Sequence, residues 1–314
     1  MTHSLSRRIV LGGAAASLLA PRAVLAQERT AIVAAGLPED SATPVLYGIS
    51  SGAFKRVDLD VTMQPQRSGS AVASGVAGGT YQIGKISMYP LILAHAKGIP
   101  FVIIAGAGLS TPKNPIFGLM ARPDSPIKTP ADLVGKTVGV GSLTDMFSLT
   151  MRAWMNKHGA DPATLKMVEI PISALGAAIA SGRVDAGAAN EPILSEAIAT
   201  GKVHLVSRMV DAIAPRFMFT AWCAMRPWAD ANRAACERFA RVVRESSAFA
   251  NAHPADTVAD ISKFTSIPPA VIQHMQRTEA ATTLDPAEVQ PVIDLIAHFK
   301  EIPKAFDARE LIWS

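Results

Sequence analysis

Residues 70–84 read SAVASGVAGGTYQIG, and residues 173–187 read SALGAAIASGRVDAG. The two stretches align without a gap and share identities at Ser70/Ser173, Ala71/Ala174, Ala77/Ala180, Gly79/Gly182 and Gly84/Gly187. Each is typical of a short amphipathic helix, a glycine stop and then a strand. Two copies of one unit predict two similar lobes, and a cleft between lobes favours ligand binding. Chance identity in a chain rich in alanine and glycine remains the alternative.

Outward from these units, strands and helices alternate through the first two thirds of the chain. This order predicts an α/β fold with mostly parallel sheets flanked by helices. The expected strands are 30–35, 57–63, 81–86, 101–105, 116–121, 137–140, 167–170, 184–189 and 203–206. The expected helices here, besides those of the two units, are 43–54, 88–97, a short one from 129, 144–158 and 192–199.

The last third of the chain has a different character. One more strand, 217–225, precedes a mostly helical region with helices expected at 227–251, 255–264, 269–275 and 286–300. If this region packs on the first lobe, the chain crosses between lobes near 107–116 and near 208–220. Two crossovers form a hinge that permits closure around a ligand. We therefore expect lobe 1 to comprise 27–110 and 218–314, and lobe 2 to comprise 111–217.

The amino terminus has the pattern of an export signal over residues 1–26. Arg7 and Arg8 precede an apolar run from Ile9 to Ala20, and the segment ends in Val24-Leu25-Ala26. This order of charged, apolar and small residues is typical of a cleaved signal, and the apolar run is too short to span a bilayer. Ser6-Arg7-Arg8-Ile9-Val10-Leu11 also resembles a twin-arginine signal, although Val10 and Gly12 depart from its strongest form. The periplasm is predicted, and the export route stays open.

Removal of residues 1–26 changes the charge balance. The chain has 30 Lys and Arg, 26 Asp and Glu, and a net charge of +4. The removed segment contains Arg7, Arg8 and Arg22 and no acidic residue, so 27 basic residues face 26 acidic ones and the net charge is +1. No attraction to nucleic acid or to an anionic membrane follows from this balance.

Several motifs resemble one family. They are GTYQIG at 79–84, SMYPLILAHAKGIP at 87–100, SPIKTPADLVGKTVGVGS at 125–142 and ALGAAIASGRVDAGAANEP at 174–192. Behind an export signal, they resemble the periplasmic substrate-binding proteins of ABC importers, in the group that takes nitrate, sulfonates, taurine and thiamine-pyrimidine precursors. The resemblance covers essentially the whole mature chain. It implies a two-lobed type II binding fold, a small-molecule ligand and membrane subunits of an importer as partners. We expect a monomer.

In lobe 1 the candidate ligand-binding residues follow strands. Ligands of open α/β sheets lie beyond the carboxyl ends of strands, where helix N-termini offer free N–H groups. The lobe 1 candidates in such positions are Ser41, Thr43, Ser68, Gly69, Ser87 and Met88. For Ser41, Thr43, Ser68 and Gly69, an ordinary helix cap is the alternative role.

In lobe 2 the candidates are Ser142, Thr144 and Glu191, with Phe219 near the second crossover. Gly139-Val140-Gly141-Ser142-Leu143-Thr144 ends a strand and opens a helix, as an anion or polar-group cradle would. Asp145 either opposes an anion there or is an exposed acid at the helix start. The family resemblance places Glu191 at the cleft, where a carboxylate disfavours a simple anion and favours a ligand with an N–H or cationic donor. Helix capping or pairing with a base is its alternative role, and core packing is the alternative for Phe217, Phe219 and Trp222.

Chemistry-bearing residues form no catalytic pattern. The seven histidines are scattered, and there is no GxSxG, HExxH or zinc-spaced Cys/His cluster. Cys223 and Cys236 could form a disulfide or remain two buried thiols. We therefore expect a solute receptor without a catalytic residue, metal or cofactor. A ligand-sensing partner of a membrane signalling protein and a pyrimidine-precursor synthase of the same fold are the alternatives.

Overall fold

The computed structural model describes residues 1, 29–209 and 212–314. Apart from Met1, the expected export signal lies outside these residues. Within the described part of the chain, no helix has the length and apolar character that a membrane crossing needs.

The first sheet, sheet A, has six strands in the order β11-β4-β10-β3-β1-β2. β1 is parallel to β2 and β3, whereas β10 is antiparallel to both β3 and β4. A strand from late in the chain therefore occupies the middle of a sheet that the early chain begins. The strands are β1 Thr30–Gly36, β2 Leu59–Pro65, β3 Ile83–Ser87, β4 Phe101–Ser110, β10 Phe217–Met225 and β11 Glu279–Ala280.

The second sheet, sheet B, has five strands in the order β7-β6-β8-β5-β9. β6 is parallel to β7 and β8, and β5 is antiparallel to β8 and β9. The expected α/β fold class is confirmed, but both sheets are mixed because β5 and β10, the strands that follow the crossovers, run against their neighbours. The strands are β5 Gly118–Ala121, β6 Thr137–Val140, β7 Lys166–Glu169, β8 Ala186–Ala189 and β9 His204–Ser207.

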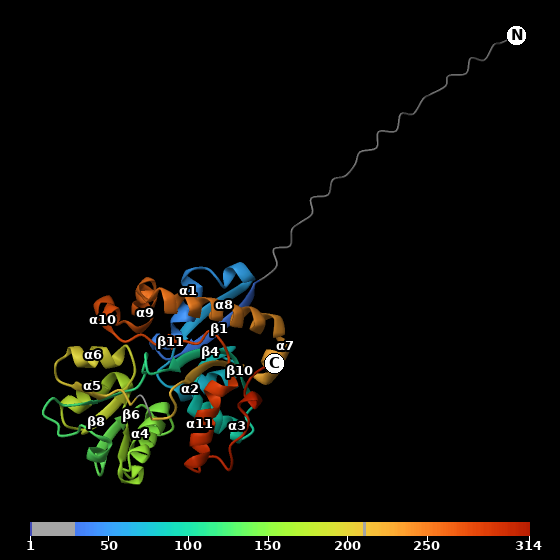
Figure 1. Ribbon diagram of the computed structural model, residues 1–314. Coiled ribbons are helices and arrows are strands. Elements are labelled where there is room, and N and C mark those ends of the chain that lie inside the picture. The colour runs from blue at the N-terminus through green and yellow to red at the C-terminus, as the bar shows by residue number, and fades with distance from the viewer. Residues whose placement is uncertain (2–28, 210–211) are drawn as a thin grey trace.

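Helices flank both sheets (Figure 1). The C-terminal helices pack on sheet A, as expected, since α8 contacts β4 and α11 contacts β10. The helices with sheet A are α1 Thr43–Ser50, α2 Gly69–Ala77, α3 Met88–Ala96, α7 Arg226–Ala231, α8 Arg233–Ala252, α9 Val258–Thr265, α10 Pro269–His274 and α11 Pro286–His298. The helices with sheet B are α4 Met146–Lys157, α5 Ile172–Ala180 and α6 Ile193–Ala199. Short 3-10 turns lie at 40–42, 55–57, 130–133, 162–164, 254–257 and 308–310.

The two sequence units at 70–84 and 173–187 adopt the same local structure. Gly79 and Gly182 follow α2 and α5 with φ of 76° and 75°, a left-handed conformation that glycine adopts at little cost. Gly84 in β3 and Gly187 in β8 let the preceding helix approach the strand. A Cβ would lie 2.7 Å from side chains of α2 at Gly84 and 2.7 Å from Leu175 of α5 at Gly187. Each unit thus uses its second shared glycine for close helix–strand packing.

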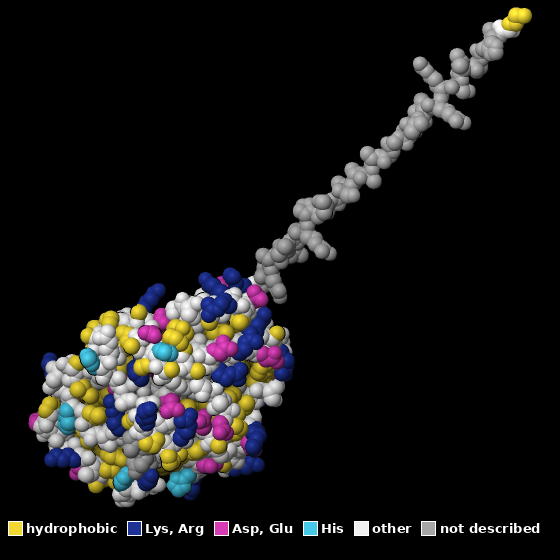
Figure 2. Space-filling model, turned by 45° about the horizontal axis from the view of Figure 1, so that its top comes forward, with side chains coloured by type: hydrophobic (Ala, Val, Ile, Leu, Met, Phe, Trp, Pro, Cys, Tyr) yellow, Lys and Arg dark blue, Asp and Glu magenta, His cyan; other side chains and the backbone are white. Residues whose placement is uncertain are grey.

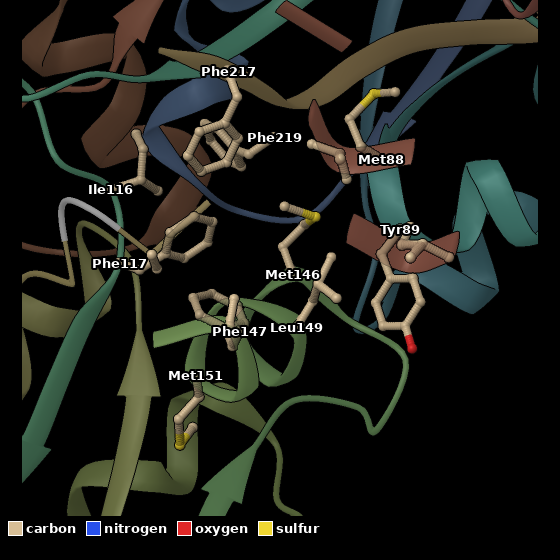
Figure 3. Packing of buried hydrophobic residues seen from close by; sticks show 14 of the residues in the cluster. Met88, Tyr89, Ile116, Phe117, Met146, Phe147, Leu149, Met151, Phe217 and Phe219 are labelled. Carbon is tan, nitrogen blue, oxygen red and sulfur yellow. The ribbon is translucent and has the colours of Figure 1, made fainter. Parts of the chain in front are cut away.

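The chain passes from sheet A to sheet B over residues 111–117 and returns to sheet A between β9 and β10, and aromatic rings pack around the end of the first connection. The ring of Phe117 lies 5.4 Å from that of Phe147 on α4 and 5.8 Å from that of Phe219 on β10, both edge to face. Figure 3 shows Phe117 between the ring of Phe147 and the overlapping rings of Phe217 and Phe219. These contacts join the parts of the chain built around the two sheets, because α4 lies with sheet B and β10 belongs to sheet A.

The lobes also meet on either side of this aromatic cluster. On one side, Arg152 of α4 pairs with Glu301 at 2.5 Å, and its Nη2 donates to the hydroxyl of Tyr89 at 3.0 Å. Tyr89 in turn donates to the Glu301 carboxylate. On the other side, Ile193 of α6 packs on an apolar cluster of α9 and α10. Elements of the two sheets are therefore in contact on both sides of the aromatic cluster.

Candidate functional site

A cavity of about 150 Å³ lies between the two lobes. Lobe 1, lobe 2 and the first crossover all contribute to its wall. The lining residues are Leu37, Glu39, Arg67, Ser68, Gly69, Ser70, Lys85, Ser87, Pro90, Phe117, Gly141, Ser142, Thr144, Asp145, Met146, Phe147, Pro171, Ile172, Asn190, Phe219 and Thr220.

Four helices begin at the wall of this cavity. Their N-cap residues are Ser68 for α2, Ser87 for α3, Asp145 for α4 and Pro171 for α5, and all four line it. The first N–H groups of a helix lack intrahelical partners, and the helix dipole places partial positive charge there. The convergence of four such ends makes the cavity favourable for hydrogen-bond acceptors and for negative charge.

Six of the ten expected ligand-binding residues line the cavity: Ser68, Gly69, Ser87, Ser142, Thr144 and Phe219. Ser68 also acts as the helix cap that was its alternative role, since its hydroxyl accepts from the Ala71 N–H at 3.2 Å. Ser142 donates to the Glu169 carboxylate at 3.2 Å. The structure therefore places the two expected cradles, before α2 and before α4, on facing sides of one space.

Ser41 and Thr43 do not line the cavity, because both are buried in a polar network behind it. The Thr43 hydroxyl donates to the Asp40 backbone oxygen at 2.6 Å. The Ser41 hydroxyl accepts from Lys85 Nζ at 2.7 Å. Their hydroxyls hold the chain after β1 in place, so they support the wall instead of forming it.

Met88 and Glu191 also lie outside the lining. Met88 is fully buried in the hydrophobic core, because it begins α3 and points away from the cavity into that core. The carboxylate of Glu191 accepts from Arg208 at 3.0 Å and from the Ser195 N–H at 2.9 Å. Both alternative roles of Glu191, pairing with a base and capping the next helix, are therefore realised.

Lys85 is the buried cation of the cavity, and the sequence argument did not single it out. It lies in β3, its side chain is 1% exposed, and its Nζ donates to Glu39 Oε2 at 2.6 Å and to Ser41. A buried charge needs such a partner. The available signal was a lysine inside an otherwise apolar strand, the pattern YQIGKI at 81–86.

Two polar side chains at the cavity have no protein partner among the described residues. Asn190, at the end of β8, is 5% exposed, and its side-chain amide makes no hydrogen bond to a described residue. The hydroxyl oxygen of Ser87 is buried and also lacks a partner. Leaving such groups unsatisfied costs about 1–3 kcal/mol each, so a bound molecule or water is needed to satisfy them.

Asp145 is the acidic residue at the start of α4, and it faces the cavity. Its carboxylate accepts from the N–H groups of Ser142 at 2.8 Å and Ser148 at 2.9 Å. Burial raises the pKa of Asp145 to about 7; the nearby Glu39 carboxylate adds to the rise, and the two N–H donors oppose it. Asp145 therefore changes its charge close to neutral pH.

Apolar groups complete the wall. The rings of Phe117, Phe147 and Phe219 line the cavity, so one of the three expected aromatic residues near the second crossover reaches it. Phe217 and Trp222 are buried in the core instead. The sequence argument named neither Phe117, which precedes β5, nor Phe147, which lies in the first turn of α4 just after the 139–144 cradle.

Among the described residues, no group of three or more His, Cys, Asp and Glu side chains is arranged to hold a metal. Cys223 and Cys236 are both buried free thiols and lie outside the cavity lining. Burial raises the pKa of both thiols, that of Cys236 to about 12. Neither is poised as a nucleophile, which requires a thiolate.

Comparisons with known proteins agree with this architecture. A curated protein of Escherichia coli (strain K12), named as an aliphatic sulfonates-binding protein, is 27% identical over 241 residues, 75% of this chain and 73% of its own length. A formylaminopyrimidine-binding protein of Halalkalibacterium halodurans is 27% identical over 144 residues, 46% of this chain and 42% of its own. The solved structure of the periplasmic aliphatic sulphonate binding protein SsuA from Escherichia coli has a TM-score of 0.71 at 23% identity, over 90% of this chain and 97% of that one.

The family model described as NMT1/THI5 like matches residues 40–257. This span contains both sequence units, both crossovers and nearly the whole cavity lining. The chain belongs to the NMT1/THI5-like family.

Proposed function

We propose that this protein is a periplasmic solute-binding receptor that captures a small organic anion between its lobes and delivers it to the membrane subunits of an ABC importer. The observation that carries the proposal is the convergence of four helix N-termini on one cavity between the parts of the chain built around sheets A and B. The relatives named as aliphatic sulfonate-binding and formylaminopyrimidine-binding proteins support a receptor for a small solute.

The cavity volume limits the size of the ligand. About 150 Å³ is the volume of an apolar cavity that admits a benzene molecule in another protein. The rings of Phe117, Phe147 and Phe219 offer edges and faces for an apolar body of that size. A ring, or a chain of similar volume, bearing one carboxylate or sulfonate fits these constraints.

The charges at the cavity favour one negative group on the ligand. Lys85 and Glu39 form a pair and largely cancel, and Arg67 lines the cavity without an ion pair to a described residue. Asp145 is only partly ionised at neutral pH. The sequence argument for a cationic or N–H donor ligand rested on Glu191, whose carboxylate is bound by Arg208, so it gives no support for such a ligand in this cavity.

The division into lobes 27–110 with 218–314 and 111–217 is part of the proposal. The crossovers at 111–117 and 208–216 would act as the hinge, and closure would bring Asn190 and the start of α4 against lobe 1. Closure changes the outer surface, and a membrane permease or, in the sensor alternative, a signalling protein would bind that closed form. Residues 1–26 would direct export, and we expect the mature chain to act as a monomer.

We propose that the ligand is bound and released unchanged. The synthase alternative would need a reactive group at the cavity. Its wall offers Lys85, but the Lys85 ammonium already donates to Glu39 and Ser41, so we propose no catalytic role for it.

On the face shown in Figure 2, cationic and anionic side chains are interspersed, and such a surface does not favour nucleic acid.

A thermal-shift screen of the purified mature chain tests the proposal. We expect benzoate or benzenesulfonate at millimolar concentration to raise the melting temperature, because a ligand that binds only the folded state stabilises it. Benzylamine and 4-aminopyrimidine, which match them in size but offer cationic or N–H donor groups, are the comparison compounds. If only the amines stabilise the protein, the proposed ligand charge is wrong; if neither set does, the proposed ligand class is wrong.

A further inference from the structure

We propose that Lys85, Ser87 and Asn190 form a polar subsite that binds an uncharged oxygen, a hydroxyl or a carbonyl, carried by the body of the ligand. The inference rests on the proposed function, because it adds a second recognition point to the same ring-sized anion. Its basis is the unused hydrogen-bonding capacity of three side chains that line one small cavity.

Lys85 has one N–H to spare. An ammonium group has three donors and no acceptor. Two of the Lys85 donors are used, toward Glu39 Oε2 at 2.6 Å and Ser41 Oγ at 2.7 Å. The remaining donor belongs to a side chain that is 1% exposed and lines the cavity. Bulk water does not reach such a group freely, so a molecule inside the cavity is its natural partner.

Ser87 lies next to this donor along the same strand. Residues two apart in a strand point to the same face, so Ser87 and Lys85 both project toward the cavity from β3. The neighbouring hydroxyl, that of Thr220 on the paired strand β10, already donates to the Ile86 backbone oxygen at 3.0 Å. The Ser87 hydroxyl is buried and finds no partner in the part of the chain that the structure describes, so it remains available to a ligand.

Asn190 completes the subsite from the opposite lobe. Asn190 as a whole residue is 5% exposed and lines the cavity, and its side-chain amide makes no hydrogen bond to a described residue. The Asp40 N–H approaches the backbone oxygen of the adjacent Glu191 at 3.4 Å. The end of β8 therefore lies against the segment that follows β1, close to Glu39. A ligand oxygen bound here would contact both lobes and would favour the closed state.

The charge of the subsite selects an uncharged oxygen. The Glu39 carboxylate lies 2.6 Å from Lys85 Nζ and neutralises it. A second carboxylate or a sulfonate at this point would face Glu39 at short range in a poorly solvated space, where like charges repel strongly. A hydroxyl or carbonyl oxygen accepts from Lys85 and Ser87 without that repulsion. The charged group of the ligand is thus left to the helix N-termini and Arg67.

Matched ligand pairs test the inference by isothermal titration calorimetry on the mature chain. The pairs are benzoate with 3-hydroxybenzoate and 4-hydroxybenzoate, and benzenesulfonate with 4-hydroxybenzenesulfonate. We expect at least one hydroxylated member to bind about 5- to 100-fold more tightly than its parent, the range that one well-made hydrogen bond in a buried site confers. In Ser87→Ala and in Asn190→Ala, the logarithm of the affinity ratio between the hydroxylated ligand and its parent should fall to less than half of its wild-type value.

Neither substitution removes a side-chain hydrogen bond to a described residue, so neither should lower the melting temperature. Ser173→Ala, at the exposed position equivalent to Ser70 in the second unit, is the matched control and should keep the full gain. If the wild type binds each ring anion and its hydroxylated form equally tightly, the proposed subsite is wrong. The proposed function as an anion receptor would still stand. A gain that survives both cavity substitutions would overturn it as well. Failure of every ring anion to bind would overturn the proposed ligand class and the subsite together.

Discussion

Asp145 combines two roles at one residue. It caps α4 by accepting from the Ser148 N–H, its carboxylate also accepts from the Ser142 N–H in the preceding loop, and it presents a carboxyl with a pKa of about 7 to the cavity. Because the pKa is raised by folding, the folded protein holds this proton more tightly than the unfolded chain. The contribution of Asp145 to stability therefore falls as the pH rises from about 4 to about 7 and is constant above that.

The same titration predicts a pH dependence of binding. An anion near Asp145 is repelled only when the carboxyl is ionised, so we expect its affinity to fall by up to about tenfold between pH 6 and pH 8. Titration calorimetry with benzoate across this range measures the effect. Asn caps helices as well as Asp does. In Asp145→Asn, the affinity for benzoate should therefore stay, at every pH in this range, near the value that the wild type has at pH 6. A benzoate affinity that stays constant or rises with pH in the wild type would mean that the bound anion does not lie near the Asp145 carboxyl.

Single residues were the hardest level to predict from sequence. The segment Asn190-Glu191-Pro192 was correctly placed near the cleft, yet Asn190 lines the cavity and Glu191 pairs with Arg208. Adjacent side chains at a strand end point in different directions, and only the position of a base seventeen residues later in the chain decided which one was free. The role of Lys85 likewise depended on Glu39, forty-six residues away.

At the scale of elements, the fit of α5 against β8 depends on Gly187. We expect Gly187→Ala to lower the free energy of unfolding by about 1–3 kcal/mol, because its Cβ would lie 2.7–3.0 Å from three atoms of Leu175. Urea denaturation followed by circular dichroism measures this. Gly69→Ala is the control, since a Cβ there meets nothing within 4 Å, and it should change stability by less than about 0.5 kcal/mol. Equal stability of the two variants would mean that the close packing is not needed.

Most elements were predictable because their signals are local. The alternation of Leu59 and Val61 identified β2, and Pro130 after Thr129 identified the short turn at 130–133, where Thr129 and Asp132 form a capping box. The expected helix 227–251 is instead two helices, α7 and α8, which meet at Asn232. The antiparallel direction of β5 and β10 has no local signal, because it follows from which sheet a crossover enters.

At the scale of the molecule, the contact of Arg152 with Tyr89 and Glu301 joins the lobes beside the cavity. We expect the double variant Arg152→Met, Glu301→Gln to have a larger population of the open state, because the ion pair that joins the lobes is lost. Both charges are removed together so that neither is left buried without a partner. The apparent affinity for the best ring anion should fall about 3- to 30-fold, in proportion to the lost closed population. Small-angle X-ray scattering should show a larger radius of gyration that returns to the wild-type value at saturating ligand.

A matched control separates closure from general loss of ion pairs. Arg309 and Asp307 form an exposed pair within lobe 1 at 3.0 Å, and Arg309→Met should leave both the affinity and the scattering unchanged. If the double variant behaves like this control, the interlobe ion pair does not contribute to closure.

The overall architecture was predictable because two independent signals agreed. The paired units at 70–84 and 173–187 indicated two lobes, and the family resemblance, confirmed by the match over residues 40–257, indicated how the chain passes between them. Neither signal supplied Phe117, Phe147 and Asn190 as members of the cavity wall. Phe117 precedes β5, Phe147 lies on α4 and Asn190 follows β8, so they meet only after folding.

The position of β10 between β3 and β4 has a consequence for the order of assembly. All strands of sheet B come from one continuous segment, 118–207, whereas sheet A lacks its middle strand until residues 217–225 are available. When the chain is synthesised from its amino terminus, segment 118–207 can complete sheet B before β10 has emerged. During this time the edges of β3 and β4 that pair with β10 stay unpaired. The N-terminal lobe is thus the last to finish, and unpaired strand edges are a known route to aggregation.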